Sequence, residues 1–450
     1  MSPFTLQLAE RVASLRLEGV PRPVLTHARL CVLDALGCAL RGSREPAARL
    51  VRALAEREGG SPAASVWGCP LRTGSLQASL LNAVSAHALD FDDTHQGVPV
   101  HATAAVLPAA FAAAELARGT IGDLLTGYVA GAETAIRAGL ALGRSHVAGG
   151  WHPTGTVGTL GAAAGAARVL GLPPEKAAQA LGLAATQAAG FMKAVTGTMA
   201  KPLNAGKAAM NGLMAALLAQ GGFTGPADIL AAGSDFATAF SEGYDPARLP
   251  FGGAHGWEVS NIAIKLFACC SLAQAALEAG RAIRREHRLD KNLISEAELR
   301  ANPRQMEVAG IPRPRTGSES KFSLAYCAAV GLGGGTGGPG DFEDESLLSP
   351  AVMALMERMS VRSDPALSEV SARIRVRTAG GETLEKFVEV ARGNSGNPAS
   401  AEEVQEKFRS LAEPVAGEAA ERIITLVLED DSLRFPVKVL AEALAAPTRG

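Results

Sequence analysis

The feature that most restricts how this chain can fold is the small size of its apolar side chains. Hydrophobic residues make up 47% of the 450 residues, yet aromatic residues make up only 4%, and there are 50 glycines. Whole stretches, such as residues 156–167 and 208–218, are dominated by Gly, Ala and short aliphatic side chains. A core of such residues closes only if helix backbones approach one another closely. We therefore expect an ordered, tightly packed helical protein and exclude a disordered chain.

Apolar residues recur at helical spacing through the first two-thirds of the chain, and the pattern changes after about residue 266. Apolar and charged residues then alternate on both sides of the Ala379-Gly380-Gly381 turn, which is typical of a β-hairpin. The expected helices lie near residues 47–58, 76–89, 104–118, 122–143, 156–170, 175–190 and 207–220.

A further helix is expected at the carboxy-terminal end of the chain. Ser400 and Glu403 have the spacing of a capping box, and an amphipathic segment follows them. We predict a mainly α protein in which residues 1–264 and 402–450 form one large all-helical domain. A smaller α+β domain, residues 265–401, is inserted between these two parts.

Net charge and cysteine usage exclude several classes of function. Lys and Arg number 43 against 45 Asp and Glu, so the chain has no basic excess for nucleic acid or an anionic membrane surface. The amino terminus lacks the apolar segment of a signal peptide, and no run of about 18 residues is continuously apolar, so we expect no membrane span. The six cysteines form no Cys-x-x-Cys pair, which favours a reducing, cytoplasmic setting.

The first group of candidate functional residues is the segment Asp90-Phe-Asp-Asp-Thr94-His95, followed by His101. Three carboxylates, a hydroxyl group and two imidazoles are unusual immediately before an apolar helix. Asp and His bind metal ions, but this spacing matches no standard closed metal site, and we predict no metal. Helix capping or pairing with an arginine remains the alternative for the Asp residues.

Further candidates come from other parts of the chain. His152 lies in a Gly/Thr-rich loop just before a small-residue helix, where backbone N–H groups favour an anion. Lys201 and Lys207 precede the next such helix, and Lys265 interrupts an apolar stretch. Tyr326 is one of only three tyrosines. The alternatives are a solvated lysine, a lysine at the edge of the core, and a tyrosine used for packing.

Together these residues suit proton transfer next to a carboxylate. Ammonium groups hold carboxylates and stabilise the enolate-like charge that develops, while a histidine moves the proton. No nucleotide or cofactor fingerprint occurs in the sequence, and we predict that no cofactor is needed. Elimination of water, decarboxylation and epimerisation all share this carbanion-like step, so the residues alone leave the reaction open.

Six sequence blocks, in order along nearly the whole chain, are similar to one known family. They are VLDALGCALRGS (32–43), NAVSAHALDFDDTH (82–95), GWHPTGTVGTLGAAAGAA (150–167), KPLNAGKAAMNG (201–212), KFSLAY (321–326) and GNSGNPASAEEVQEKF (393–408). They resemble the MmgE/PrpD family, which includes 2-methylcitrate dehydratase, cis-aconitate decarboxylase and iminodisuccinate epimerase. The resemblance implies a homodimeric, cofactor-independent enzyme with the inserted domain as a lid and the active site between the domains.

The resemblance also implies roles for individual residues. His101 would be the general acid or base, and Tyr326 would assist as a proton donor. Asp90 and Thr94 would orient His101 or the substrate. The groups that bind the carboxylates of a small anionic substrate would be His152, Lys201 and Lys265.

Two positions depart from the family pattern. Gln274 stands where the family commonly has His, and Cys270 stands where relatives similar to cis-aconitate decarboxylase have His. Our main hypothesis is a hydro-lyase that acts on a small di- or tricarboxylic acid. The alternatives are an epimerase of an imino- or aminodicarboxylate, a decarboxylase of a cis-aconitate-like acid, and a catalytically silent carboxylate-binding homologue.

Overall fold

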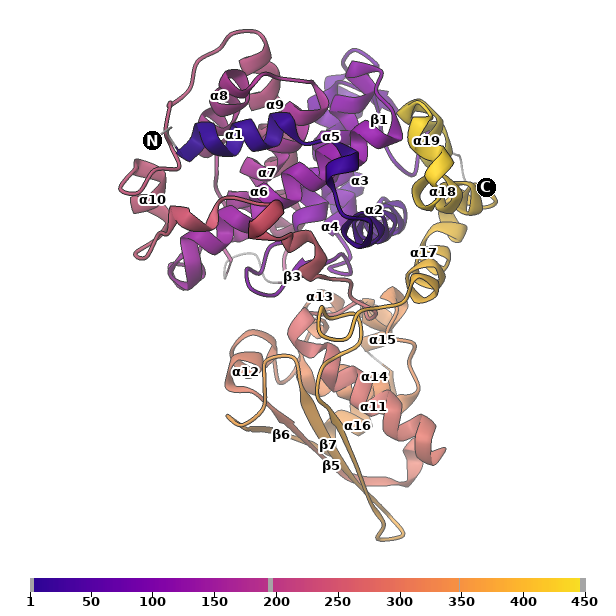
Figure 1. Ribbon diagram of the computed structural model, residues 1–450. Coiled ribbons are helices and arrows are strands. Elements are labelled where there is room, and N and C mark those ends of the chain that lie inside the picture. Colours follow the sequence, from indigo (N-terminus) through magenta and orange to yellow (C-terminus); the bar gives the residue numbers. More distant parts are fainter. Residues whose placement is uncertain (1–3, 193–196, 348, 446–450) are drawn as a thin grey trace.

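The protein is mainly helical, as the sequence predicted, and its strands form small sheets (Figure 1). This description comes from a computed structural model, which describes residues 4–192, 197–347 and 349–445. Most helices gather in the upper part of the view, and the largest sheet lies below them with its own set of helices.

Buried hydrophobic residues form two clusters. One contains residues between positions 8 and 264 and between 404 and 444, and we call the part built around it the helical lobe. The other contains residues 267–391 and a few side chains from elsewhere, such as Leu89 and Phe91, and we call its part the mixed lobe. These two clusters support our proposal of a helical domain made from both chain ends with an inserted α+β domain.

The helical lobe is built around α7, which packs against α5, α6, α8 and α9. Its helices are α1 (Phe4–Ser14), α2 (Arg22–Gly42), α3 (Pro46–Glu58), α4 (Ser75–His87), α5 (Ala102–Ala117), α6 (Ile121–Ala148), α7 (Pro153–Val169), α8 (Pro174–Ala185), α9 (Ala200–Gln220), α10 (Asp235–Phe240), α17 (Ala401–Ala416), α18 (Ala419–Leu428) and α19 (Val437–Leu444).

Glycine allows α6 and α7 to approach closely, as the small-residue runs predicted. A Cβ atom at Gly161 would lie 2.6 Å from the carbonyl oxygen of Gly131, and a Cβ at Gly131 would lie 2.5 Å from the oxygen of Gly161. No side chain fits at such distances without moving a backbone. The two glycines therefore set the spacing between α6 and α7.

The start of α9 differs from the prediction. The helix begins at Ala200 rather than near residue 207, so Lys201 and Lys207 lie within it and not in a preceding loop. Pro202 is tolerated because the first N–H groups of a helix have no partner within the helix. Gly206 is needed for packing, since a Cβ there would lie 2.9 Å from the carbonyl oxygen of Leu80 in α4.

The mixed lobe contains a four-stranded sheet in the order β6-β5-β7-β8, in which only the β5–β6 pair is parallel. Helix α11 packs against β7 and β8, and the sequence-predicted hairpin is confirmed as β7–β8. The elements are α11 (Gln274–His287), α12 (Pro303–Ala309), α13 (Gly317–Ser320), α14 (Leu324–Gly333), α15 (Asp344–Leu347), α16 (Pro350–Glu357), β5 (Ile294–Ala301), β6 (Met359–Ser363), β7 (Ala372–Thr378) and β8 (Thr383–Val388).

Short strands outside this sheet matter for the site. Strand β3 (Thr94–His95) pairs with β4 (Ile262–Ala263), which brings the chain just before Lys265 beside the Asp90–Thr94 segment. A separate pair, β1 (Ala64–Ser65) with β2 (Arg72–Thr73), lies near α4 and α5.

The chain returns to the helical lobe through α17, which packs against α2. The predicted capping box is confirmed, because Ser400 and Glu403 each bond the other's backbone N–H. Gly37 of α2 lies under Phe408, whose Cδ2 would be 2.9 Å from a Cβ at that glycine. This close packing holds Lys407, the neighbour of Phe408, against the 89–91 segment.

One helix, α2, is long and apolar enough to cross a membrane by length and composition, with a mean hydropathy of 1.3. In the folded protein, 78% of its apolar window is buried against other elements. Its apolar residues, including Leu33, Leu36 and Leu40, belong to the core of the helical lobe.

Candidate active site

The site is centred on the loop between α4 and α5, where Asp90 has a positive φ of 53°. Three consecutive carbonyl groups of this loop each accept a hydrogen bond from a different lysine. Leu89 O accepts from Lys321 at 2.6 Å, and Asp90 O accepts from Lys265 at 2.7 Å. Phe91 O accepts from Lys407 at 2.7 Å. The lysines hold the loop in a conformation that an Asp residue adopts at modest cost.

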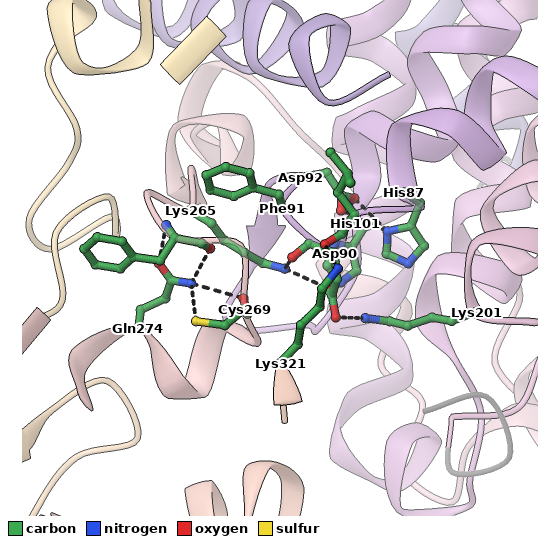
Figure 2. Close-up of polar contacts among 12 residues, drawn as sticks. His87, Asp90, Phe91, Asp92, His101, Lys201, Lys265, Cys269, Gln274 and Lys321 are labelled. Atoms are coloured by element: carbon green, nitrogen blue, oxygen red, sulfur yellow. Dashed lines mark hydrogen bonds and ion pairs between the residues drawn. The ribbon is translucent and has the colours of Figure 1, made fainter. Parts of the chain in front are cut away.

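The Asp90 carboxylate forms ion pairs with two lysines from distant parts of the chain (Figure 2). Its Oδ2 lies 2.5 Å from Nζ of Lys201 in α9, and its Oδ1 lies 2.7 Å from Nζ of Lys265. Burial raises the pKa of Asp90, but the two ammonium groups outweigh burial and hold this pKa well below its usual range. The same pairing raises the pKa of Lys265 against the opposing effect of burial. Asp90 and Lys265 are therefore both charged at neutral pH.

Next to this cluster, Asp92 is shared by two histidines. Nδ1 of His87 lies 2.9 Å from Asp92 Oδ2, and Nδ1 of His101 lies 3.1 Å from the same oxygen. Burial, partly offset by Asp92, lowers the pKa of His101 to about 4. His101 is thus neutral at neutral pH and able to accept a proton. Since two imidazoles hold the pKa of Asp92 well below its usual range against the effect of burial, Asp92 is an ionised acceptor and Nδ1 of His87 carries a proton.

His152 completes the group of imidazoles. It is the N-cap residue of α7, as predicted, and its ring lies 6.2 Å from that of His87. The side-chain amide of Asn204 donates to its Nδ1 at 3.0 Å, so Nε2 carries the proton. Burial lowers the pKa of His152 well below its usual range. Nε2 of both His87 and His152 is buried without a hydrogen-bond partner among the described residues, as expected of atoms that await a ligand.

The two imidazoles around Asp92 also form a candidate metal-binding group. One ligand atom from each of His87, Asp92 and His101 lies within 4.8 Å of the others, which would suffice for three ligands. However, both Nδ1 atoms approach one Asp92 oxygen, so at least one of these nitrogens carries a proton rather than a free lone pair. The donor set therefore fits a proton-transfer group, in which Asp92 orients two imidazoles, better than a metal site.

The structure brings together most of the residues that the sequence selected. Asp90, His101, His152, Lys201 and Lys265 come from distant segments and form one continuous buried group.

The other two sequence candidates lie differently. Thr94 is buried in β3, where its backbone pairs with Ala263, two residues before Lys265. Tyr326 lies in the core of the mixed lobe, where its hydroxyl group donates to Asp341 O at 2.7 Å and its ring contacts Phe342. No described contact joins Tyr326 to the cluster, and its role as a proton donor stays a prediction.

Several residues of the cluster were not selected from the sequence. His87 is three residues before Asp90, at the end of α4, and a helix of small residues gave no sign that its ring faces the loop. Asp92 was noted only as one of three carboxylates. Lys321 begins the KFSLAY block, in which Tyr326 was the residue predicted to belong to the site. Asn204 could have been found from its position one helical turn after Lys201.

The two positions that depart from the family pattern have different surroundings. Backbone groups satisfy the hydrogen-bonding capacity of the Gln274 side chain. Its amide accepts from Phe267 N at 3.1 Å and donates to Phe267 O at 2.8 Å and to Cys269 O at 3.1 Å. It ties the turn that follows Lys265 and does not face the cluster (Figure 2). Burial and the nearby charge of Asp90 raise the pKa of Cys270 to about 11, so its thiol is neutral.

Comparisons with known proteins match nearly the whole chain to one family. Residues 6–249 match the model of the MmgE/PrpD N-terminal domain, and residues 267–431 match that of the MmgE/PrpD C-terminal domain. A cis-aconitate decarboxylase-like protein of Aspergillus oryzae is 31% identical, with 94% of each chain covered. Cis-aconitate decarboxylases of Aspergillus terreus and Homo sapiens are 30% and 27% identical, covering 100% and 99% of this chain and 97% and 95% of theirs. The chain therefore belongs to the MmgE/PrpD family.

Proposed function

We propose that the protein is a lyase that acts on a cis-aconitate-like di- or tricarboxylic acid by moving a proton next to a carboxylate. The observation that carries this proposal is the Asp90 carboxylate held between Lys201 and Lys265, beside the neutral imidazole of His101. Lysines thus already bind a carboxylate, that of the protein's own Asp90, next to the imidazole that transfers the proton in this proposal. The relatives named above, which are cis-aconitate decarboxylases, supply the substrate class.

In this proposal each side chain has a defined task. Lys201 and Lys265 bind a substrate carboxylate and stabilise the negative charge that develops on it. His101 transfers the proton, and Asp92 keeps the imidazole oriented and stabilises its protonated form. The buried Nε2–H of His152 donates a hydrogen bond to the substrate. Burial excludes water, which strengthens these electrostatic interactions.

Decarboxylation is the reaction that the named relatives favour. When a carboxylate leaves as CO₂ from the carbon next to the C=C bond of cis-aconitate, its bonding electron pair forms a new C=C bond. The electrons of the old double bond then take up a proton at the carbon that bears another carboxylate. Charge develops next to a carboxylate bound by lysines. His101, which is neutral at rest, takes up a proton from solvent before each turnover and then supplies it to the substrate carbon. Dehydration, the reaction we predicted first from the sequence, needs the same groups.

The test is incubation of the purified protein with cis-aconitate, citrate, methylcitrate and, separately, an amino- or iminodicarboxylate in D₂O, followed by proton NMR and measurement of CO₂. Release of CO₂ with one deuteron incorporated supports decarboxylation, whereas a new C=C bond from citrate or methylcitrate without CO₂ supports dehydration. Deuterium exchange of an amino- or iminodicarboxylate without either change would indicate an epimerase. If high enzyme concentrations change none of these acids, the lyase proposal is wrong. The variant His101→Gln serves as the inactive control.

A further inference from the structure

Lys321 is the ammonium group of the cluster whose task the proposed function leaves open. It lies in the turn between α13 and α14 of the mixed lobe, and its side chain reaches across to Leu89 in the helical lobe. In Figure 2 its end lies beside Asp90, close to the ends of Lys265 and Lys201. The turn is held in place because Cys270 N donates to Lys321 O at 3.0 Å and Phe322 stacks against Lys201.

Lys321 differs from the neighbouring lysines in its partners. Lys201 and Lys265 pair with Asp90, and Lys407 pairs with Asp34. Within the described part of the chain, no carboxylate lies within ion-pair distance of Lys321 Nζ, which donates to the carbonyl of Leu89. An ammonium group has three N–H donors, and a neutral carbonyl compensates poorly for the water lost on burial. The position therefore suits an anion that arrives with the substrate.

The charges around Asp90 indicate how many carboxylates of a substrate the site can bind. Among the described residues, Asp90 carries the one carboxylate in ion-pair contact with Lys201 and Lys265, and Lys321 has none, since Asp92 is taken up by His87 and His101 and Glu45 acts on Lys321 only at longer range. Three ammonium groups thus have one nearby carboxylate between them, which leaves an excess of two positive charges. Lys201 and Lys265 converge on one carboxylate, whereas Lys321 approaches from a separate turn.

We propose that Lys321 binds a second carboxylate of the substrate and thereby makes the site selective for di- and tricarboxylic acids over monocarboxylic acids. This inference rests on the proposed function for the presence of a carboxylate substrate. It adds the residue that distinguishes substrates by their number of carboxylates. The ammonium keeps its bond to Leu89 O and uses its remaining donors for the substrate. Because Lys321 belongs to the mixed lobe and Lys201 to the helical lobe, such a substrate bridges the two lobes.

The experiment measures binding by calorimetry, independently of turnover, with three saturated acids that have no C=C bond to react. These acids are tricarballylate with three carboxylates, succinate with two and propionate with one. Lys321→Gln keeps a donor for Leu89 O but removes the charge, Lys321→Arg keeps the charge, and Lys321→Met is a second neutral variant. Lys386→Met removes a lysine of the same lobe that pairs with Glu286 far from the site. Circular dichroism and melting curves select the neutral variant that folds like the parent.

We expect the neutral variant to bind tricarballylate and succinate about tenfold to a hundredfold more weakly than the parent, with propionate nearly unchanged. Lys321→Arg should retain most of the affinity, and Lys386→Met should match the parent. A purely structural role for Lys321 predicts equal losses for all three acids, and that result overturns the proposal. Unchanged binding of succinate overturns it as well.

The outcome is separable from that of the proposed function. A parent protein that converts none of the unsaturated acids, but whose succinate affinity depends on Lys321, refutes the lyase and supports the second-carboxylate site. A parent that is active, with succinate binding unaffected in the neutral variant, supports the lyase and refutes the role of Lys321. If the parent binds none of the three acids, the role of Lys321 is refuted and the proposed function loses its main support.

Discussion

Replacing Asp90 by Asn tests whether this carboxylate holds the lysines of the site together. The side chain is buried and pairs with Lys201 at 2.5 Å and with Lys265 at 2.7 Å. Asn has the same shape and also tolerates the left-handed backbone found at φ 53°, so the substitution removes little more than the charge. Two ammonium groups then remain buried without their counter-ion.

Removal of one partner from a buried ion pair costs about 3 to 5 kcal/mol. Unfolding a chain of 450 residues carries an entropy of about 2.1 cal/mol/K per residue, so this cost corresponds to a fall in the melting temperature of about 3 to 5 °C. Asp90→Ala should be less stable than Asp90→Asn by a further 1 to 2 kcal/mol or so, because Ala at positive φ is strained. Tricarballylate should recover part of the loss in Asp90→Asn, since an added anion takes the place of the missing carboxylate.

The assay is thermal unfolding followed by circular dichroism, with Glu385→Gln as the matched control. Glu385 pairs with Arg373 and Arg375 on the surface of the sheet, so its loss should cost no more than about 1 kcal/mol. Because pairing lowers the pKa of Asp90, its stabilisation is present above the ordinary pKa of Asp and is lost as the pH falls. The difference in melting temperature between the parent and Asp90→Asn should therefore be constant near neutral pH and become smaller below about pH 4. If Asp90→Asn melts within about 2 °C of the parent, Asp90 does not hold the lysines and the reasoning is refuted.

Four further predictions follow from the geometry. His101→Gln should lower kcat by about a hundredfold to ten-thousandfold with little change in melting temperature, and full activity would exclude His101 as the proton carrier. Decarboxylation uses the protonated form of His101, so kcat of the parent should rise as the pH drops toward the pKa of His101, which is about 4, whereas dehydration uses the neutral form as a base, so kcat should fall there. A transition near pH 6.5 would contradict the effect of burial in either case. Gly161→Ala should destabilise the protein by about 1 to 3 kcal/mol in urea titrations, because its Cβ would lie 2.6 Å from Gly131 O. Tyr326→Phe should cost about 0.5 to 1.5 kcal/mol through the lost bond to Asp341 O and leave kcat unchanged, whereas a large loss of kcat would support the predicted proton donor.

Local patterns in the sequence predicted local structure well. The β7–β8 hairpin, the capping box at Ser400 and the position of His152 before α7 all depend on residues a few places apart. The start of α9 was missed because Pro202 and Gly206 are normally helix breakers. Pro202 is harmless in the first turn, and Gly206 serves the contact with α4, which no local pattern reveals.

The candidate site was only partly predictable for the same reason. The DFDDTH block and the histidine that follows it by six residues marked Asp90 and His101 as unusual, and the isolated lysines marked Lys201 and Lys265. The pattern gave no means of choosing between a ligand-binding lysine and a structural one. The structure shows Lys407 deep in the protein, paired with Asp34 and bonded to two carbonyl groups, which is a positioning role that its place on an amphipathic helix did not suggest.

By itself, the sequence determined that the core would be made of closely packed helices, since small residues leave no other way to exclude water. It also determined which segments were chemically unusual. Only the tertiary structure decided which charges meet, because the lysines that reach residues 89–91 stand 175, 232 and 316 positions away from their partners. Contacts over such separations depend on how helices and lobes pack against one another. A periodic pattern records which face of a helix is buried, but not which charged group it will meet there.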